Sequence, residues 1–201
     1  MKLIILGIQG SGKGTQGKLI AEKYKLKHIS TGDLLRAEVK KKSELGREIS
    51  SYIDKGNLVP DSLITKMLQQ NLPKDNYLLD GYPRNIEQAK TLDKIAKVDR
   101  AIFLELGEDE VYKRLSSRYS CTKCKIDYGL NRMPKKDGIC DKCGEEMPLR
   151  KDDNPEAIKK RVAIFNKETF PLIDYYKSRI VRINGNQTVE NVFGDIAKIL
   201  G

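Results

Sequence analysis

A glycine-rich turn near the start of the chain decides the fold: Gly7-Ile8-Gln9-Gly10-Ser11-Gly12-Lys13-Gly14-Thr15. The apolar residues 2–6 before it are typical of a buried strand, and residues 13–24 after it have the spacing of a helix. Glycines let several backbone N–H groups converge on one point, while the helix dipole and Lys13 add positive charge. This arrangement predicts a loop that holds phosphate groups.

The rest of the chain alternates short apolar runs with segments of helical spacing. Thr31 is expected to cap the helix after the second strand, with Asp33 near its positive end. Such alternation predicts an α/β fold, in which a P-loop parallel β-sheet of about five strands is covered by helices on both faces. The further predicted strands are 28–30, 77–79, 101–106 and 180–183. The further predicted helices lie within 31–55 and over 61–72, 85–96, 109–119, 154–176 and 188–200.

Composition and charge narrow the choice of partners. The 201 residues include 38 Lys and Arg against 28 Asp and Glu, a formal balance of +10. This length suggests one domain or one core with insertions, and the basic balance favours phosphorylated small molecules, nucleic acid or anionic lipid as partners. No export signal is recognisable, and no run approaches the about 20 apolar residues of a membrane span. We therefore expect a cytoplasmic chain with no membrane partner.

Four cysteines form two C-x-x-C pairs, Cys121 with Cys124 and Cys140 with Cys143, and 15 residues separate the pairs. Paired cysteines at this interval have the ligand spacing of a tetrahedral Zn²⁺ site. In a reducing compartment a metal is favoured over disulfides, which remain the alternative. Four thiolates leave no open coordination position, so the zinc is expected to be structural. Flanking lysines, among them Lys125, can offset the negative charge of the centre.

One detail of the loop separates it from the common phosphate-loop pattern, which has Ser or Thr directly after the lysine. Here Gly14 stands between Lys13 and Thr15. This variant resembles the nucleoside monophosphate kinases, and the adenylate kinase family in particular. Further segments resemble motifs of that family in the same order: Thr31-Gly32-Asp33-Leu34-Leu35-Arg36, Gly56-Asn57-Leu58-Val59-Pro60-Asp61, Asp80-Gly81-Tyr82-Pro83-Arg84 with Gln88, and Arg150-Lys151-Asp152-Asp153 with Arg161.

The resemblance implies a reversible phosphoryl transfer from Mg·ATP to AMP, giving two ADP. Because the acceptor phosphate is already ionised, such a reaction needs positioning and cations rather than a strong general base. His28, the one histidine, is therefore expected to be structural or exposed. Asp80 ends a strand beside the loop, where a carboxylate can hold Mg²⁺ through water. The implied catalytic residues are Lys13, Asp80, Arg84, Arg118, Arg150 and Arg161.

The resemblance also assigns residues to the two nucleotides. Gln88 is expected to read the adenine of AMP, and Gln187 to touch the adenine of ATP through its backbone. The implied ATP site comprises Gly10, Ser11, Gly12, Lys13, Gly14, Thr15, Arg114, Arg118, Asp127, Tyr128 and Gln187. The implied AMP site comprises Thr31, Arg36, Asn57, Leu58, Val59, Gly81, Tyr82, Pro83, Arg84, Gln88, Arg150 and Arg161.

The same resemblance implies a division of the single chain into three parts. Residues 1–29, 60–116 and 154–201 form the core, residues 30–59 an AMP-binding insertion, and residues 117–153 a zinc-bearing lid. The lid is expected to swing on hinges near residues 116–120 and 149–153, which would keep water away from the transferred group. A monomer is expected.

Two other functions are weighed against this one. A UMP/CMP kinase shares the fold, but its usual short lid does not fit the long cysteine-bearing insertion. A nucleic-acid-binding protein with a zinc lobe would suit the basic charge. It would leave the segments 31–36 and 80–84 unexplained, and the lobe is poor in aromatic residues on which bases could stack. We therefore expect ATP, AMP and ADP as partners, and no nucleic acid.

Overall fold

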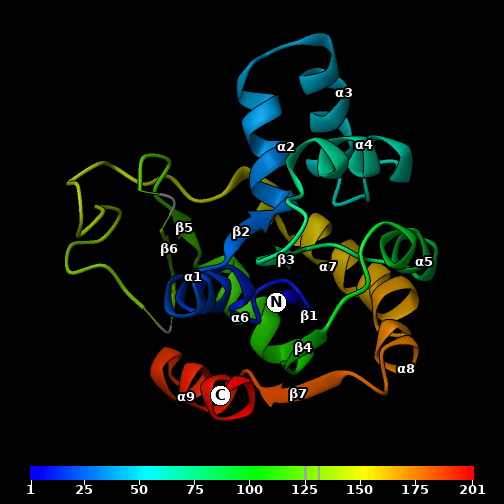
Figure 1. The fold of residues 1–201 in the computed structure, drawn as a ribbon. Helices are drawn as coiled ribbons and strands as arrows, with labels where there is room; N and C mark the ends of the chain where they lie inside the picture. Colours follow the sequence, from blue (N-terminus) through cyan, green and yellow to red (C-terminus); the bar gives the residue numbers. More distant parts are fainter. Residues whose placement is uncertain (125, 131) are drawn as a thin grey trace.

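The computed structural model describes residues 1–124, 126–130 and 132–201, so Lys125, predicted to lie beside the cysteines, is outside the described residues. A parallel sheet of five strands forms the centre of the molecule, in the order β2-β3-β1-β4-β7 (Figure 1). The predicted α/β fold with about five parallel strands is confirmed. The strands are β1 (Lys2–Gly7), β2 (Lys27–Ser30), β3 (Tyr77–Asp80), β4 (Arg100–Glu105) and β7 (Ile180–Asn184).

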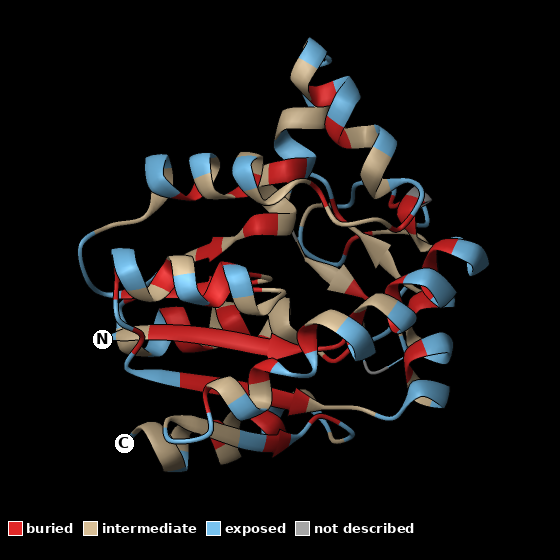
Figure 2. Cartoon of the chain, turned by 90° about the vertical axis from the view of Figure 1, so that its right-hand side faces the viewer, coloured by how far each residue is buried: buried red, intermediate tan, exposed pale blue. Residues whose placement is uncertain are grey.

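Helices cover both faces of this sheet, which explains why its inner strands are apolar without interruption. In β1, Leu3 and Ile5 pack against α1 (Lys13–Tyr24) and α9 (Val189–Leu200), while Ile4 and Leu6 belong to the cluster on the other face. In Figure 2 the central strands have the buried colour, and the outer sides of the covering helices are exposed. That other face is covered by α5 (Ile86–Ile95), α6 (Glu108–Ser116), α7 (Pro155–Ile164) and α8 (Leu172–Tyr175).

Two lobes extend from the layered core in Figure 1. The upper lobe contains α2 (Thr31–Lys40) and α3 (Glu44–Ile53), and α4 (Asp61–Asn71) lies at its base. The other lobe contains two short antiparallel strands, β5 (Tyr119–Ser120) and β6 (Asp127–Tyr128). The second lobe has its own small buried cluster, made of Cys121, Tyr128, Cys140 and Met147.

Three predicted local features are wrong. Ser30, not Thr31, caps α2, because its side chain accepts a hydrogen bond from the backbone N–H of Asp33 and Thr31 is the first helical residue. The helix predicted over 109–119 ends at Ser116, since the chain then enters β5. The helix predicted over 154–176 is interrupted by the π-helical turn Phe165–Thr169. Pro171, which has no N–H to continue a helical ladder, follows that turn.

Among the described residues, we find no helix that combines the length and the apolar character needed to cross a membrane.

Candidate functional site

A cavity of about 750 Å³ opens at the carboxyl ends of β1 and β3, between the core and the two lobes. Crevices at this end of a parallel sheet are the usual place for a ligand. The structure brings together nearly all of the residues that the sequence assigned to catalysis and to the two nucleotide sites. Those that line the cavity are Gly10, Ser11, Gly12, Lys13, Gly14, Thr15, Thr31, Arg36, Asn57, Leu58, Val59, Asp80, Gly81, Pro83, Arg84, Gln88, Arg114, Arg118, Asp127, Tyr128, Arg150, Arg161 and Gln187.

The glycine-rich loop ends at the N-terminus of α1, which borders this cavity. Gly12 is the N-cap and has φ 93°, a conformation that residues with a Cβ rarely adopt. No described side chain caps this end, and the first turn holds no acidic residue. The first N–H groups of α1 therefore lack a side-chain acceptor, and together with the helix dipole they suit an anion.

The side-chain amine of Lys13 folds back over the loop. Its Nζ donates hydrogen bonds to the carbonyl oxygens of Gly7, at 2.7 Å, and Ile8, at 2.8 Å. Burial lowers the pKa of Lys13 to about 8; Asp80 opposes this shift, and nearby arginines add to it. A positive charge is thus costly at this position without an anion, and a bound phosphate would relieve that cost.

The charged form of Arg84 is also disfavoured by its surroundings. Burial lowers its pKa to about 10, with further lowering by the charges of Arg161 and Arg36 and an opposing effect of Asp80. Its Nε donates to the carbonyl oxygen of Gly81 at 2.9 Å. The crowding of these cations around one cavity indicates a ligand with several negative charges.

Asp80 lies at the end of β3 and is 7% exposed, with its carboxylate beside the loop. A Cβ on Gly14 would lie 3.7 Å from its Oδ2. On the other side, Nε2 of the mostly buried His28 is 3.6 Å from the same oxygen. An acidic oxygen next to a phosphate-type loop fits a Mg²⁺ ion held through water.

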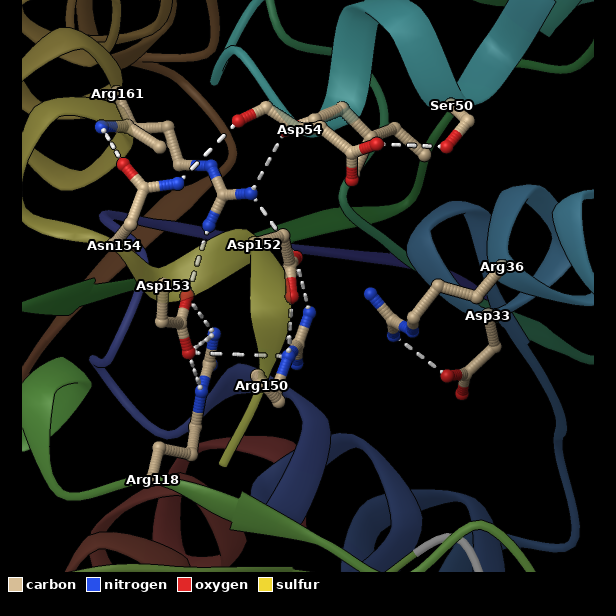
Figure 3. Close-up of polar contacts among 12 residues, drawn as sticks. Asp33, Arg36, Ser50, Asp54, Arg118, Arg150, Asp152, Asp153, Asn154 and Arg161 are labelled. Carbon is tan, nitrogen blue, oxygen red and sulfur yellow. Dashed lines mark hydrogen bonds and ion pairs between the residues drawn. The ribbon is translucent and has the colours of Figure 1, made fainter. Parts of the chain in front are cut away.

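Three of the predicted phosphate-binding arginines meet two neighbouring carboxylates at the junction between the cysteine lobe and the core (Figure 3). Arg118 donates to Asp153 through Nε at 2.8 Å, and Arg150 donates to Asp152 through a terminal nitrogen at 2.7 Å. Arg161 bridges both carboxylates, at 3.0 Å from Asp152 and 2.9 Å from Asp153. Three positive charges therefore share two negative ones.

Burial and pairing act in opposite directions on this network. Burial lowers the pKa of Arg150, but its hydrogen bonds and attraction to Asp152 and Asp153 outweigh burial and leave the pKa above its usual range. Burial also raises the pKa of Asp152, yet Arg150 and Arg161 hold it well below the usual carboxyl range. For Arg118, burial and the charge of Arg150 prevail over Asp153, and the pKa is lowered.

Gln88 also lines the cavity and is 3% exposed. Its side-chain amide donates to Asp61 at 2.6 Å and accepts from the backbone N–H of Arg84 at 2.7 Å. The hydroxyl of Tyr82 donates to the carbonyl oxygen of Gln88, so this buried tyrosine supports the wall from behind. Apolar walls come from Leu35, Ile53, Leu58, Val59 and Ile64.

Two residues that were predicted to contact ATP form hydrogen bonds or ion pairs with other groups of the protein. Arg114 pairs with Glu110 at 2.9 Å and donates to the carbonyl oxygen of Gly185 at 3.2 Å, which ties α6 to the loop before α9. The hydroxyl of Tyr128 accepts from the backbone N–H of Asp141 at 3.1 Å and lies 3.7 Å from Sγ of Cys140. The polar end of Tyr128 thus faces the cysteine cluster, although the residue borders the cavity.

Asp127 brings the cysteine lobe close to the glycine-rich loop. Its Oδ2 lies 3.8 Å from the place that a Cβ on Gly14 would occupy, and its other oxygen accepts from the hydroxyl of Ser120. The lobe therefore approaches the N-terminus of α1 at this residue.

The four cysteines form one cluster in which all Sγ atoms lie within 4.8 Å of one another. Cys121 and Cys143 are 3.6 Å apart at sulfur, and all four thiols are free. Tetrahedral Zn–S bonds of about 2.3 Å place sulfurs about 3.8 Å apart. The residues present therefore fit a four-coordinate metal ion rather than two disulfides, whose bonded sulfurs lie about 2 Å apart.

Sequence reasoning missed the partners of the site residues. Asp61, Asp152 and Asp153 lie within the segments that resemble family motifs, but no local pattern indicates which side chains they bond. Their neighbours in the sequence, Arg150 and the Gly-Asn-Leu-Val-Pro segment, indicate that both segments contribute to the nucleotide sites. The pairings themselves join residues 35 positions apart for Arg118 with Asp153 and 27 apart for Gln88 with Asp61.

Comparisons with known proteins agree with this geometry. The family model described as adenylate kinase matches residues 5–181. An adenylate kinase of Lachnospira eligens is 44% identical, and the match covers 100% of both chains. Adenylate kinases of Clostridium botulinum and Methanothrix thermoacetophila are 42% and 44% identical, over 100% of this chain and 99% and 98% of theirs. With the motifs gathered around one cavity and these relatives matched end to end, the chain belongs to the adenylate kinase family.

Proposed function

We propose that this chain catalyses the reversible, Mg²⁺-dependent transfer of a phosphoryl group from ATP to AMP, giving two ADP. The observation that carries the proposal is the cavity itself, where Lys13, Arg84, Arg118, Arg150 and Arg161 border one space. Two nucleotides brought phosphate to phosphate need such a density of cations. The names of the curated relatives support the same reaction.

The donor ATP would lie with its phosphates on the glycine-rich loop. The uncapped N–H groups of α1 and the amine of Lys13 would exchange their present surroundings for phosphate oxygens. Magnesium, when bound with ATP, would neutralise phosphate charge, and Asp80 would hold it through water. Asp127 and Gln187 would border the donor nucleotide from the two sides of the loop.

The acceptor AMP would lie against the part of the cavity wall that contains Gln88 and Val59. Gln88 would meet its adenine, with apolar contact from Val59, and Arg36 and Arg84 would hold its phosphate. Arg36 pairs with the half-exposed Asp33 at 2.7 Å. Ion pairs near the surface contribute little to stability, so phosphate can replace that partner. The cations would then stabilise the charge that spreads over the transferred group, with no general base required.

We infer the same three-part division as the sequence suggested, with a core, an AMP-binding insertion over 30–59 and a lid over 117–153. The two chain segments that enter and leave the lid run side by side, joined by a bridge between Tyr119 and Leu149. The backbone N–H of Arg150 also donates to the carbonyl oxygen of Arg118 at 3.4 Å. Rotation about this pair of segments would move the lobe as one unit over the phosphates.

Zinc is the metal that we propose for the four cysteines, with a structural role. The lid has a buried cluster of only a few residues, which is too small to hold its shape alone. A four-thiolate centre would stiffen it, so that closure positions arginines and excludes water. We further propose that the protein acts as a monomer in the cytoplasm, with ATP, AMP and ADP as its ligands.

Parallel assays with AMP, UMP, CMP and GMP as acceptors and ATP as donor test the proposal. AMP is expected to be the preferred acceptor, with two ADP formed per turnover and Mg²⁺ required. A preference for UMP or CMP would instead assign the chain to pyrimidine nucleotides. Absence of transfer to any acceptor, combined with a salt-dependent shift of RNA, would replace the enzyme with a nucleic-acid-binding role.

A further inference from the structure

The amide of Gln88 is held between a group that can only accept hydrogen bonds and one that can only donate them. Its Nε2 donates to Oδ1 of Asp61 at 2.6 Å, and its Oε1 accepts from the backbone N–H of Arg84 at 2.7 Å. An ionised carboxylate has no hydrogen to give, and a backbone N–H has no lone pair to offer. If the amide turned by 180°, both of these contacts would become repulsive.

Asp61 is itself fixed from two sides. It lies in the first turn of α4, and its other oxygen, Oδ2, accepts from the side-chain amide of Asn85 at 3.1 Å. Asn85 caps α5 by accepting from the backbone N–H of Gln88 at 2.8 Å. Asp61, Asn85 and Gln88 therefore form a closed set of hydrogen bonds, which the backbone N–H of Gln88 completes. Neither amide can turn without breaking one of these bonds.

The held orientation leaves the amide with one further lone pair on Oε1 and one further hydrogen on Nε2. Adenine offers the matching edge, since its 6-amino group donates and its N1 accepts. Hypoxanthine and guanine offer the opposite edge, because their O6 accepts and their N1–H donates. Only a turned amide could pair with that second edge.

From these contacts we propose that Asp61 is a positioning residue that fixes the Gln88 amide and so determines the preference for adenine over 6-oxopurines at the acceptor site. The inference rests on the proposed function, because it requires the base of the acceptor to lie against Gln88. A site with fixed, buried polar groups rejects a mismatched edge strongly, because the mismatch leaves those groups unpaired. Asp61 makes the orientation of Gln88 fixed rather than adaptable.

The test compares AMP with IMP, whose bases differ in this edge and whose ribose and phosphate are the same. In the native enzyme, kcat/KM for AMP is expected to exceed that for IMP by more than a hundredfold, in the range of other sites that read a polar edge. In Asp61→Asn, an amide at position 61 that still accepts from Asn85 would present its NH₂ to Gln88. Each orientation of Gln88 would then satisfy one neighbour and oppose the other, because the backbone N–H of Arg84 remains a donor, and the amide would no longer be held in one orientation. The ratio of the two kcat/KM values is therefore expected to fall at least tenfold, while KM for ATP stays within about twofold.

The ratio is independent of how much of the variant folds, because both substrates see the same active fraction. If Asp61→Asn cannot be purified, Asp61→Ser also removes the fixed acceptor and is expected to lower the ratio. Asp93→Asn is the matched control, since Asp93 pairs with Arg179 at 2.6 Å outside the cavity, and its ratio is expected to equal the native one. Asp61→Glu, which keeps a carboxylate, is expected to recover part of the native ratio.

Two results separate the inference from the function on which it rests. A native enzyme that prefers AMP, together with an Asp61→Asn ratio within twofold of native, would overturn the role of Asp61 and leave the reaction intact. A native enzyme that uses IMP as well as AMP would also overturn the inference and leave the transfer to AMP intact. A native enzyme that prefers UMP would instead remove the proposed acceptor and with it the basis for this inference.

Discussion

The lowered pKa of Lys13 makes ATP binding depend on pH between 7 and 9, above the pKa of about 6 of a terminal phosphate. With a pKa of about 8 in the free enzyme, the protonated fraction of Lys13 falls from about nine-tenths at pH 7 to about one-tenth at pH 9. Bound phosphate raises the lysine pKa again, because an opposite charge favours the protonated form. Binding at pH 9 must therefore take up a proton that the free enzyme lacks.

The size of this effect follows from the two fractions. Affinity for ATP is expected to be about tenfold weaker at pH 9 than at pH 7, or about 1.4 kcal/mol. Arg84 stays largely protonated up to pH 9, because its pKa is about 10. The loss over this range is thus assigned to Lys13. The sign is fixed by the direction of the shift: a lysine with a raised pKa would give constant affinity over the same range.

Isothermal titration calorimetry of ATP binding, without AMP and in two buffers of different ionisation enthalpy, measures both quantities. Proton uptake is expected to rise from about 0.1 per site at pH 7 to about 0.9 at pH 9. Lys13→Met has no titrating amine and should bind weakly at both pH values, with no uptake from this site. Equal native affinity at pH 7 and pH 9, with no net proton uptake, would refute the idea that burial of Lys13 is relieved by phosphate.

The other expectations concern the metal, the chemistry, the acceptor and the lid. Metal analysis of the unchelated protein should find about one zinc per chain, and Cys121→Ser should lower the melting temperature with loss of lid structure first; two disulfides and no metal would contradict this. Arg84→Ala should reduce kcat about a hundredfold or more, as for other electrostatic stabilisers, whereas near-native turnover at saturating AMP would remove its role. Gln88→Ala should raise KM for AMP by a factor equivalent to about 1–3 kcal/mol, with KM for ATP unchanged as the check. Distance labels can be placed at the exposed positions Lys136, in the lid, and Gln69, in the core. When an inhibitor that joins two adenosines through five phosphates binds, the labels should approach each other by several ångströms, an order of magnitude typical of lid closure. An unchanged distance with the inhibitor bound would exclude a swinging lid.

The sheet was predictable because its strands carry their own signal. An apolar run buried on both faces, as in β1, is legible without knowledge of its neighbours, and the glycine-rich turn after it marks where the chain reverses into a helix. The boundaries of the helices were harder to predict from the sequence. Ser30 and Thr31 are both good caps, and only the backbone conformation in the fold decides between them. The break at Phe165–Thr169 accompanies aromatic packing of Phe165 on Phe103, a contact across the fold that local periodicity does not contain.

For the candidate site too, the sequence predicted some features and not others. Motifs identified which residues gather around the cavity, because short segments such as Asp80-Gly81-Tyr82-Pro83-Arg84 keep their spacing whatever the fold does around them. They did not identify which groups those residues bond in this state. The hydroxyl of Tyr128 faces Cys140 inside the lobe, and the donors of Arg114 reach the Gly185 loop. Such choices depend on three-dimensional proximity, which no local pattern encodes.

The pairing of Arg118, Arg150 and Arg161 with Asp152 and Asp153 has a physical consequence for any anion that binds there. Buried arginines without partners would pay a large desolvation cost, so the two carboxylates keep them charged and ordered before a ligand arrives. The same carboxylates weaken the positive field, because two of the three charges are already matched. A phosphate must therefore compete with Asp152 and Asp153 or use the guanidinium hydrogens that they leave free. Arg118 and Arg150 lie in the two chain segments that join the lobe to the core, whereas Arg161 belongs to α7 in the core. Either route therefore links anion binding to movement of the junction between lobe and core. Binding of an anionic ligand is thus coupled to the position of the lobe. An arginine can exchange a carboxylate partner for a phosphate partner, so that no buried charge is left unpaired.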